Sequence, residues 1–450
     1  MKIVKTILVL LLLINLSGCG IFSSCEPKDG VVCYDNKTDS YVLEDGAVLN
    51  VAVPNEAYGQ ALVSLWDTTY PDHAGVVTYT VLDDRSAVYY YNNNNYDLIY
   101  ISETELPMIM DQVQALDEHA VDSSEKYQVD KFAQLINSEE YRFVPLTYNG
   151  FLFAYDETML NDLGISLTDS DNDGLPDSID TWEEIFTRIT AYNEGRLTAD
   201  FTSFFPLAFN EKYSFYGLLT GGGWEMFSSL KADDPGFDTQ AFRLSLNFIY
   251  DLGKYSWNLD AADDSSDYVF QYEDVLANQS SPLTLIASWM YYQEYENINE
   301  CNYRFAHMPS YGGNIMTPLV GIEGYAISSS TLYPGAANQL LTLIRSKAGL
   351  EMMLNSTDLI PIIALSDDLD ITISDQNKYD MIKAYAYSIE EPLIALSADT
   401  TIRAWQLYYD CDWLSVIKQL YDHQITVSEA QQQIEQLASD WLTEKGEIAG

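Results

Sequence analysis

Apolar and polar positions alternate along the chain with two different periods, which predicts a mixture of strands and helices. The short apolar run Leu49–Val53 predicts a buried strand, and the apolar spacing over 57–69 predicts an amphipathic helix. Two further strands are expected at 76–82 and 97–101. A strand–helix–strand order of this kind is typical of a parallel α/β sheet.

The mixed pattern continues to the end of the chain without a repeat of fixed period. Strands are predicted at 144–156 (VPLTYNGFLFAYD) and 324–327, and helices at 181–194, 240–252, 336–346 and 427–442. Asp180 or Thr181 is expected to cap the first of these helices. The Tyr- and Asn-rich run 89–95 is interpreted as a surface loop. A chain of 450 residues exceeds what one core usually serves, so we expect two lobes.

The first 19 residues resemble the signal of a bacterial lipoprotein. Lys2 and Lys5 precede an apolar run, and Leu16-Ser17-Gly18-Cys19 follows as a small-residue processing site. The apolar run is shorter than the roughly 20 residues that span a bilayer. We therefore predict a signal peptide at 1–18, acylation of Cys19, and a location outside the cytoplasm at the cell membrane. The alternative is an ordinary export signal with an incidental cysteine. Residues 19–48 are expected to form a tether, with folding beginning near Leu49.

Charge and cysteine content limit the possible partners. With 22 Lys and Arg against 68 Asp and Glu, the net charge is -46, which makes nucleic acid an unsuitable partner and favours a neutral or cationic ligand. Outside the cytoplasm, the economical disulfide pairing joins Cys25 to Cys33 and Cys301 to Cys411, while four free thiols are the alternative.

The segment 169–180, DSDNDGLPDSID, has the spacing of a calcium loop. Aspartates occupy loop positions one, three and five, glycine at position six allows a sharp turn, and position seven offers a carbonyl oxygen. A structural calcium ion at one site is therefore expected. Its predicted ligands are Asp169, Asp171, Asp173, the Leu175 carbonyl, Asp177 and Asp180. The loop resembles those of EF-hands and of thrombospondin or dockerin repeats, except that Asp180 replaces the usual glutamate; the alternative is an acidic surface turn.

Catalytic signatures are sparse, whereas aromatic side chains are abundant. Nucleophile elbows, zinc helices and phosphate loops are lacking, and the four histidines are scattered singly, so no catalytic residues are assigned and no enzyme is expected. Aromatic residues form 13% of the chain. Sugars stack on aromatic rings and bond to carboxylates and amides, so two segments that combine these groups, 209–216 and 288–292, are candidate ligand sites.

From about Leu49 onward the chain resembles the extracellular solute-binding proteins of ABC importers, in particular the maltose/maltodextrin-binding group. No single motif carries the resemblance; the order of several short ones does. They are Asn55-Glu56, YDLIY at 96–100, PLTYNG at 145–150, TWEEI at 181–185, FNE at 209–211, LIASW at 285–289, Met308-Pro309 and PLVGIEG at 318–324.

The resemblance implies an α/β fold of the periplasmic-binding-protein type (type II), with a ligand cleft between two lobes. Lobe 1 would comprise 49–147 and 325–370, and lobe 2 would comprise 148–324 and 371–450, with 169–180 as an insertion. The residues that it implies for ligand binding are Asn55, Glu56, Glu103, Tyr148, Asn149, Glu211, Tyr213, Trp289, Tyr291 and Trp405. The family often has an aromatic pair in a late helix; here Leu396–Thr401 takes its place and Trp405 follows.

These observations together favour a monomeric, lipid-anchored binding protein that captures a carbohydrate, such as a maltodextrin-like oligosaccharide, and passes it to permease subunits by hinge closure. Two alternatives from other classes stay open. A surface glycoside hydrolase or lyase would need two carboxylates facing each other in a cleft. A calcium-dependent adhesin would lose its partner when calcium is removed.

Overall fold

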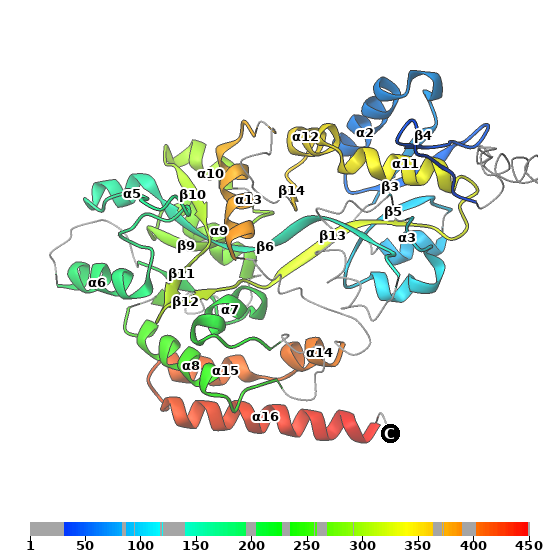
Figure 1. Ribbon diagram of the computed structural model, residues 1–450. Coiled ribbons are helices and arrows are strands. Elements are labelled where there is room, and N and C mark those ends of the chain that lie inside the picture. Colours follow the sequence, from blue (N-terminus) through cyan, green and yellow to red (C-terminus); the bar gives the residue numbers. More distant parts are fainter. Residues whose placement is uncertain are drawn as a thin grey trace, which may run out of the picture.

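An eight-stranded mixed sheet forms the centre of the computed structural model (Figure 1). The structure describes residues 31–82, 87–93, 95–117, 119, 140–194, 204–226, 235–255, 257–258, 268–290, 292–362, 371, 373–388 and 402–448. Six strands follow the order β10-β6-β13-β5-β3-β4, and β9 and β14 also pair with β6. The strands of this sheet are β3 (Leu49–Val53), β4 (Val77–Val81), β5 (Leu98–Ser102), β6 (Val144–Asp156), β9 (Leu283–Ala287), β10 (Tyr303–Ala306), β13 (Val320–Ile327) and β14 (Ile360–Pro361).

Among the described residues, three two-stranded sheets and a set of helices surround this sheet. The small sheets pair β1 (Tyr34–Asp35) with β2 (Ser40–Tyr41), β7 (Pro206–Leu207) with β8 (Trp257–Asn258), and β11 (Met308–Tyr311) with β12 (Asn314–Met316). The helices are α2 (Glu56–Thr69), α3 (Ala87–Asn93), α5 (Glu157–Asp162), α6 (Trp182–Asn193), α7 (Lys212–Leu219), α8 (Gln240–Leu252), α9 (Tyr268–Asn278), α10 (Tyr292–Asn299), α11 (Pro334–Arg345), α12 (Lys347–Ser356), α13 (Gln376–Ser388), α14 (Ile402–Asp410), α15 (Trp413–Tyr421) and α16 (Val427–Ile448), with 3-10 turns η1 (Pro71–His73), η2 (Leu106–Gln112) and η4 (Thr220–Gly222).

The parallel part of the sheet is confirmed for the first strands only. β3 pairs in parallel with both β4 and β5, as the strand–helix–strand order predicts. In contrast, β6 pairs antiparallel with β9, β10, β13 and β14, so the sheet as a whole is mixed rather than parallel. The strand–helix–strand order did not predict these antiparallel pairings, because antiparallel neighbours need no helical crossover between them. The pairings of β6 instead join segments that lie far apart in the chain.

The long strand β6 connects two parts of the molecule. Its first half pairs with β13 and β14, and its second half pairs with β9 and β10. Nearly every side chain of β6 is buried, which explains why its sequence is a continuous apolar run instead of an alternating one. In Figure 1, β6 and β13 run side by side from the part that contains β3–β5 to the part that contains β9–β12.

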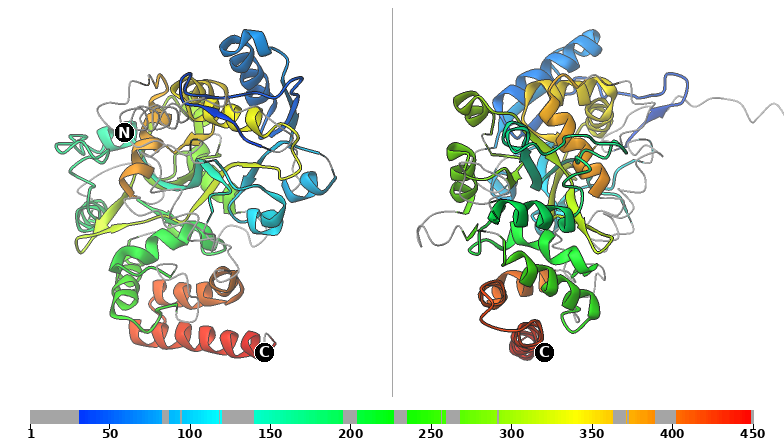
Figure 2. Two further views of the ribbon diagram at one scale, coloured as in Figure 1. Left: turned by 45° about the vertical axis from the view of Figure 1, so that its right-hand side comes forward. Right: turned by 90° about the vertical axis from the view of Figure 1, so that its left-hand side faces the viewer.

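Two hydrophobic cores lie along these strands. The smaller core contains Tyr58, Trp66 and Leu340, and it lies between β3–β5 and the helices α2 and α11. The larger core contains Trp182 and Trp413 and extends over β6, β9 and the helices α6–α8 and α15. Figure 2 shows α15 and α16 together at the end of the molecule that is farthest from α2. Two cores in a mixed α/β fold are consistent with the expected two-lobed architecture.

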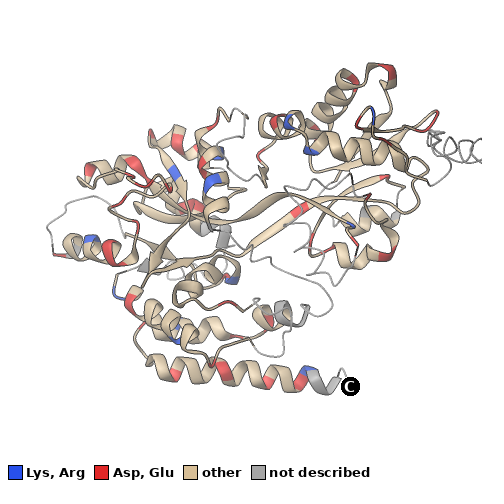
Figure 3. Ribbon diagram, in the orientation of Figure 1, with Lys and Arg blue, Asp and Glu red and all other residues tan. Residues whose placement is uncertain are grey.

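Acidic residues occur on helices and loops of every part of the fold, while Lys and Arg are few and dispersed (Figure 3). With a net charge of -46, this distribution gives a negative field around the protein. None of the described helices combines the length and the apolar content needed to cross a bilayer.

Residues 31–48 differ from the tether expected for them, because they pack against the folded body. Tyr41 is buried, and its backbone N–H donates to Gln339 Oε1 at 2.7 Å. The Glu44 carboxylate accepts hydrogen bonds from the N–H groups of Gly335 and Ala336 at the start of α11. A carboxylate at a helix N-terminus stabilises both partners. Folding therefore begins before Leu49.

Two further expectations are corrected by the structure. The Tyr- and Asn-rich segment forms helix α3 over Ala87–Asn93 instead of a loop, and the Tyr91 hydroxyl donates to the Gln112 carbonyl oxygen. Cys301 and Cys411 are free thiols, so the pairing expected between them is not formed. Cys33 is disulfide-bonded, and its predicted partner Cys25 lies outside the described residues.

Candidate functional site

Trp289 presents a partly exposed indole ring beside β6. It lies two residues after the end of the buried strand β9 and has 41% of its surface exposed, although tryptophan side chains are usually much more buried. The ring meets Phe151 edge-on at 5.7 Å between centroids and lies 6.3 Å from the ring of Tyr213. These two neighbours fix the indole in place while one part of it stays accessible to a ligand.

Tyr213 and Asn149 meet next to this ring. Tyr213 lies in the first turn of α7, and its hydroxyl donates to the Asn149 carbonyl oxygen at 3.2 Å. Burial raises the pKa of the Tyr213 hydroxyl well above its ordinary value, and the negative charge of Glu103 raises it further. The hydroxyl is therefore protonated at neutral pH, and it can donate a hydrogen bond.

Glu103 brings a buried carboxylate near Tyr213 from the end of β5. It follows β5, accepts a hydrogen bond from the Ile322 N–H at 2.7 Å, and is almost fully buried. Burial raises the pKa of Glu103 well above its ordinary value, and the charges of Glu323 and Glu105 raise it further. The hydrogen bond from the Ile322 N–H lowers this pKa but does not outweigh burial. The structure thus groups Glu103, Asn149, Tyr213 and Trp289, which lie far apart in the sequence.

Glu103→Gln is expected to change the pH dependence of stability. The folded-state pKa of Glu103 is raised above its unfolded-state pKa of about 4.3. The contribution of Glu103 to stability is therefore fully present below about pH 4.3 and is lost as the pH rises through the folded-state pKa. Glutamine keeps an oxygen acceptor for the Ile322 N–H but does not ionise. Denaturant unfolding at pH of about 4.5 and about 7.5 should show the variant gaining stability relative to wild type at the higher pH. If the free energies of unfolding of variant and wild type differ by the same amount at both pH values, the pKa of Glu103 is not raised in the folded protein.

The other predicted ligand residues that the structure describes make contacts within the fold. Asn55 caps α2, and the exposed Glu56 accepts a hydrogen bond from the Tyr79 hydroxyl. Glu211 caps α7 by accepting from the N–H groups of Tyr213 and Ser214. Tyr148 is buried against Tyr385, with 5.4 Å between ring centroids. Tyr291 and the side chain of Trp405 lie outside the described residues.

A pocket of about 220 Å³ opens beside Trp289. It lies between the turn after β9 and the elements α10, β14 and α13. Its lining combines the Trp289 indole and apolar side chains with polar ones. The apolar residues are Met290, Tyr292, Ile360 and Met381, and the polar ones are Ser288, Gln293, Glu294, Asp358 and Lys378. Since pockets for drug-sized ligands usually exceed about 300 Å³, this one has room for roughly a single sugar ring.

The loop 169–180 is folded around the side chain of Asp169. The two oxygens of this carboxylate accept from the N–H groups of Asp173 at 3.1 Å and Gly174 at 3.0 Å. Gly174 has φ +109°, a conformation that other residues rarely adopt, so the predicted sharp turn is confirmed. The buried side chains of Leu175 and Ile179 anchor the loop in the larger core.

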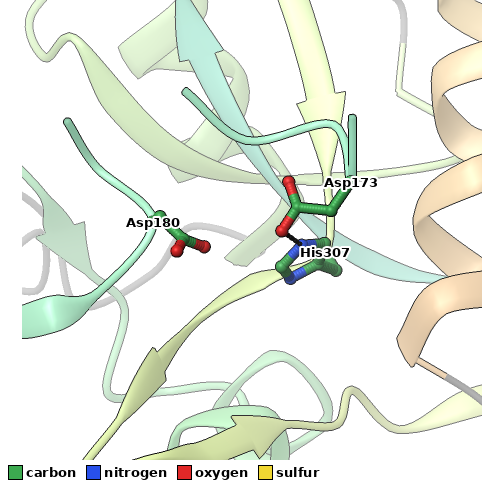
Figure 4. Close-up of side chains that lie close together, drawn as sticks. All are labelled: Asp173, Asp180 and His307. Carbon is green, nitrogen blue, oxygen red and sulfur yellow. Dashed lines mark ion pairs between the residues drawn. The ribbon is translucent and has the colours of Figure 1, made fainter. Parts of the chain in front are cut away.

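The acidic residues of the loop form two groups rather than one. Carboxylate oxygens of Asp169, Asp171 and Asp177 lie within 4.8 Å of one another. The second group contains Asp173 and Asp180 together with His307, again within 4.8 Å (Figure 4). His307 lies between β10 and β11, more than a hundred residues from the loop, and the Ser310 N–H donates to the Asp180 carbonyl oxygen.

The sequence did not indicate His307 as a ligand, because no histidine, cysteine or acidic residue lies within four positions of it in a metal-binding spacing. Only the packing of β11 beside the loop reveals the group, through the pairing of Thr181 with Ser310. Burial alone would raise the pKa of Asp173, but the His307 ring and the Leu175 N–H outweigh it and lower that pKa. Burial and the charge of Asp173 raise the pKa of Asp180.

Comparison with known protein families identifies one match. Residues 87–379, well over half of the chain, match the model of the family described as bacterial extracellular solute-binding protein. A search of curated proteins found no match. The match includes Glu103, Asn149, Tyr213 and Trp289 as well as the loop 169–180. Proteins of this family are typically non-enzymatic, lie outside the cytoplasm, and bind solutes for ABC transporters. The chain therefore belongs to the bacterial extracellular solute-binding protein family.

Proposed function

We propose that this protein is a lipid-anchored binding protein that captures a carbohydrate and delivers it to the permease of an ABC importer. The single observation that carries the choice of carbohydrate is the partly exposed Trp289 ring beside a pocket lined by both apolar and polar side chains. A sugar has an apolar C–H face that stacks on an indole and hydroxyl groups that need carboxylate, amide and ammonium partners. The pocket offers both kinds of surface.

The grouping of Glu103, Asn149 and Tyr213 supports closure around the ligand as the mechanism. Glu103 belongs to the part of the chain assigned to lobe 1, whereas Tyr213 belongs to lobe 2. The strands β6 and β13 cross between these parts, so a small change in their backbone angles would move the two parts against each other. A ligand that contacts both parts would then stabilise the closed form, which the permease would recognise.

A thermal-shift screen tests the proposed solute class. The chain from Cys25 onward is heated with mono- and oligosaccharides, amino acids, peptides and polyamines, and each bound ligand is recovered and analysed by mass spectrometry. A ligand present at 100 times its Kd should stabilise the protein by about 2.7 kcal/mol. We expect a sugar to raise the Tm and to be recovered intact. A response to peptides or polyamines alone would refute the carbohydrate proposal, and cleaved sugar would indicate a hydrolase.

We further propose that the loop 169–180 binds a calcium ion with a structural role. Asp169, Asp171 and Asp177 already gather their carboxylates, and hard oxygen ligands of this kind suit calcium. The loop is followed by Thr181, which caps α6 by accepting from the Glu184 N–H. A bound ion would thus hold the start of this helix in position.

Asp171→Ala should remove the response of the protein to calcium. This exposed carboxylate accepts no described hydrogen bond, so its loss should cost little stability without calcium. In wild type, calcium at 100 times its Kd should add about 2.7 kcal/mol of stability, and the variant should lose most of it. Melting curves with calcium and with a chelator measure the effect. Sugar affinity should stay nearly unchanged; a large loss would place the ion at the sugar site.

A further inference from the structure

The side chains of Asp173, Asp180 and His307 form a group whose chemistry differs from that of a calcium loop. They come from both ends of the loop and from the connection between β10 and β11 (Figure 4). Figure 4 shows the two carboxylates and the imidazole directed toward a common space. Calcium prefers ligands that are all oxygen, whereas an imidazole nitrogen among carboxylates suits zinc and related transition metals.

The buried imidazole of His307 is oriented as a metal ligand would be. Its ring is only 3% exposed and stacks on Tyr387 at 4.0 Å between centroids. Nδ1 lies 2.9 Å from the Met308 carbonyl oxygen, and because a carbonyl oxygen can only accept, Nδ1 carries the proton of this hydrogen bond. Metal-binding histidines are commonly oriented in this way, with the other ring nitrogen donating to a carbonyl or carboxylate.

The second ring nitrogen, Nε2, is buried and lacks a hydrogen-bond partner among the described residues. It nevertheless lies 3.1 Å from Asp173 Oδ2, an ion-pair distance without hydrogen-bond alignment. When the neutral ring carries its proton on Nδ1, Nε2 presents a lone pair to this carboxylate oxygen, and a cation placed between the two atoms would be bound by both. Two ligands of one tetrahedral zinc ion, each about 2.0–2.1 Å from the metal, are about 3.3 Å apart. The observed separation is close to that value.

Hydrogen bonds also position Asp173 and Asp180 beside His307. Asp173 Oδ1 accepts from the Leu175 N–H at 2.8 Å, which turns Oδ2 toward His307. The Asp180 backbone is fixed by the Ser310 N–H, so β11 supports Asp180 and adjoins His307. We propose that Asp173, Asp180 and His307 bind a divalent transition metal, with zinc as the preferred ion and a fourth position left for water.

Metal titration of the chelator-treated chain from Cys25 onward tests this site. Zn²⁺ is followed by calorimetry, and Co²⁺ by the visible absorbance of a tetrahedral site. We expect one high-affinity site in wild type. His307→Gln and Asp180→Asn should each lower the Zn²⁺ affinity by at least about tenfold. Asp180→Asn provides the test if the buried His307→Gln variant fails to fold, as checked by circular dichroism.

Matched variants separate this site from other metal-binding groups. His423→Gln removes an exposed histidine and Cys301→Ser removes a free thiol, and both should leave the Zn²⁺ affinity unchanged. Asp171→Asn should lower calcium affinity and preserve zinc affinity, because Asp171 belongs to the other group. The proposal is overturned if wild type binds no Zn²⁺, or if folded His307→Gln binds Zn²⁺ as tightly as wild type. The latter result would assign His307 and Asp173 to a simple ion pair.

Discussion

Trp182→Ala is expected to lower the free energy of unfolding by about 3–5 kcal/mol. Trp182 is fully buried at the start of α6, two residues after the end of the loop 169–180. Its ring meets Phe205 and Phe248, each at 5.0 Å between centroids, and its indole N–H donates to Met316 Sδ. Alanine would leave a large cavity in the larger core, because rigid secondary structure around it can collapse only in part.

Denaturant unfolding of wild type, Trp182→Ala and Trp182→Phe measures this effect. The Phe variant keeps most of the ring contacts and should lose less stability than the Ala variant. Ile298→Ala is the matched control, because Ile298 is a large apolar residue that is mostly exposed and should contribute little. A loss below about 1 kcal/mol for Trp182→Ala would mean that the surrounding aromatic side chains repack, which would contradict the rigid packing argued for the core around Trp182.

Trp289→Ala is expected to weaken carbohydrate binding by about 1–3 kcal/mol, which corresponds to roughly a 5- to 150-fold higher Kd. The reason is that the exposed indole would lose its stacking contact with the sugar ring. Because the ring is partly exposed, stability without ligand should change little. The measurement is calorimetric titration with the sugar that the thermal-shift screen identifies.

Tyr89→Ala serves as the control for the loss of an exposed aromatic ring. Tyr89 is 44% exposed, close to the value for Trp289, but it lies in α3 and away from the residues that line the pocket. Trp289→Phe should retain part of the affinity. If Trp289→Ala binds the sugar as wild type does, Trp289 is not in the binding site, and the choice of carbohydrate loses its main support.

The sequence by itself determined much of the local structure. The strand at 144–156 and the helix at 240–252 were predicted with the observed ends, because long runs of consistent periodicity identify an element without knowledge of its neighbours. The turn at Gly174 and the cap at Thr181 were also predictable, since both depend on residues a few positions apart. The order of short motifs indicated a solute-binding protein, and the family match confirms that class.

Tertiary structure alone decided which of these elements meet. The antiparallel pairing of β6 with β9 and β10, the docking of Tyr41 on the body, and helix α3 all depend on contacts between distant segments. The same holds for the sites. Sequence spacing predicted one group of acidic ligands in the loop, whereas packing against β11 placed Asp173 and Asp180 beside His307. Periodicity and spacing report local geometry, but a buried histidine acquires its partners only when the chain folds.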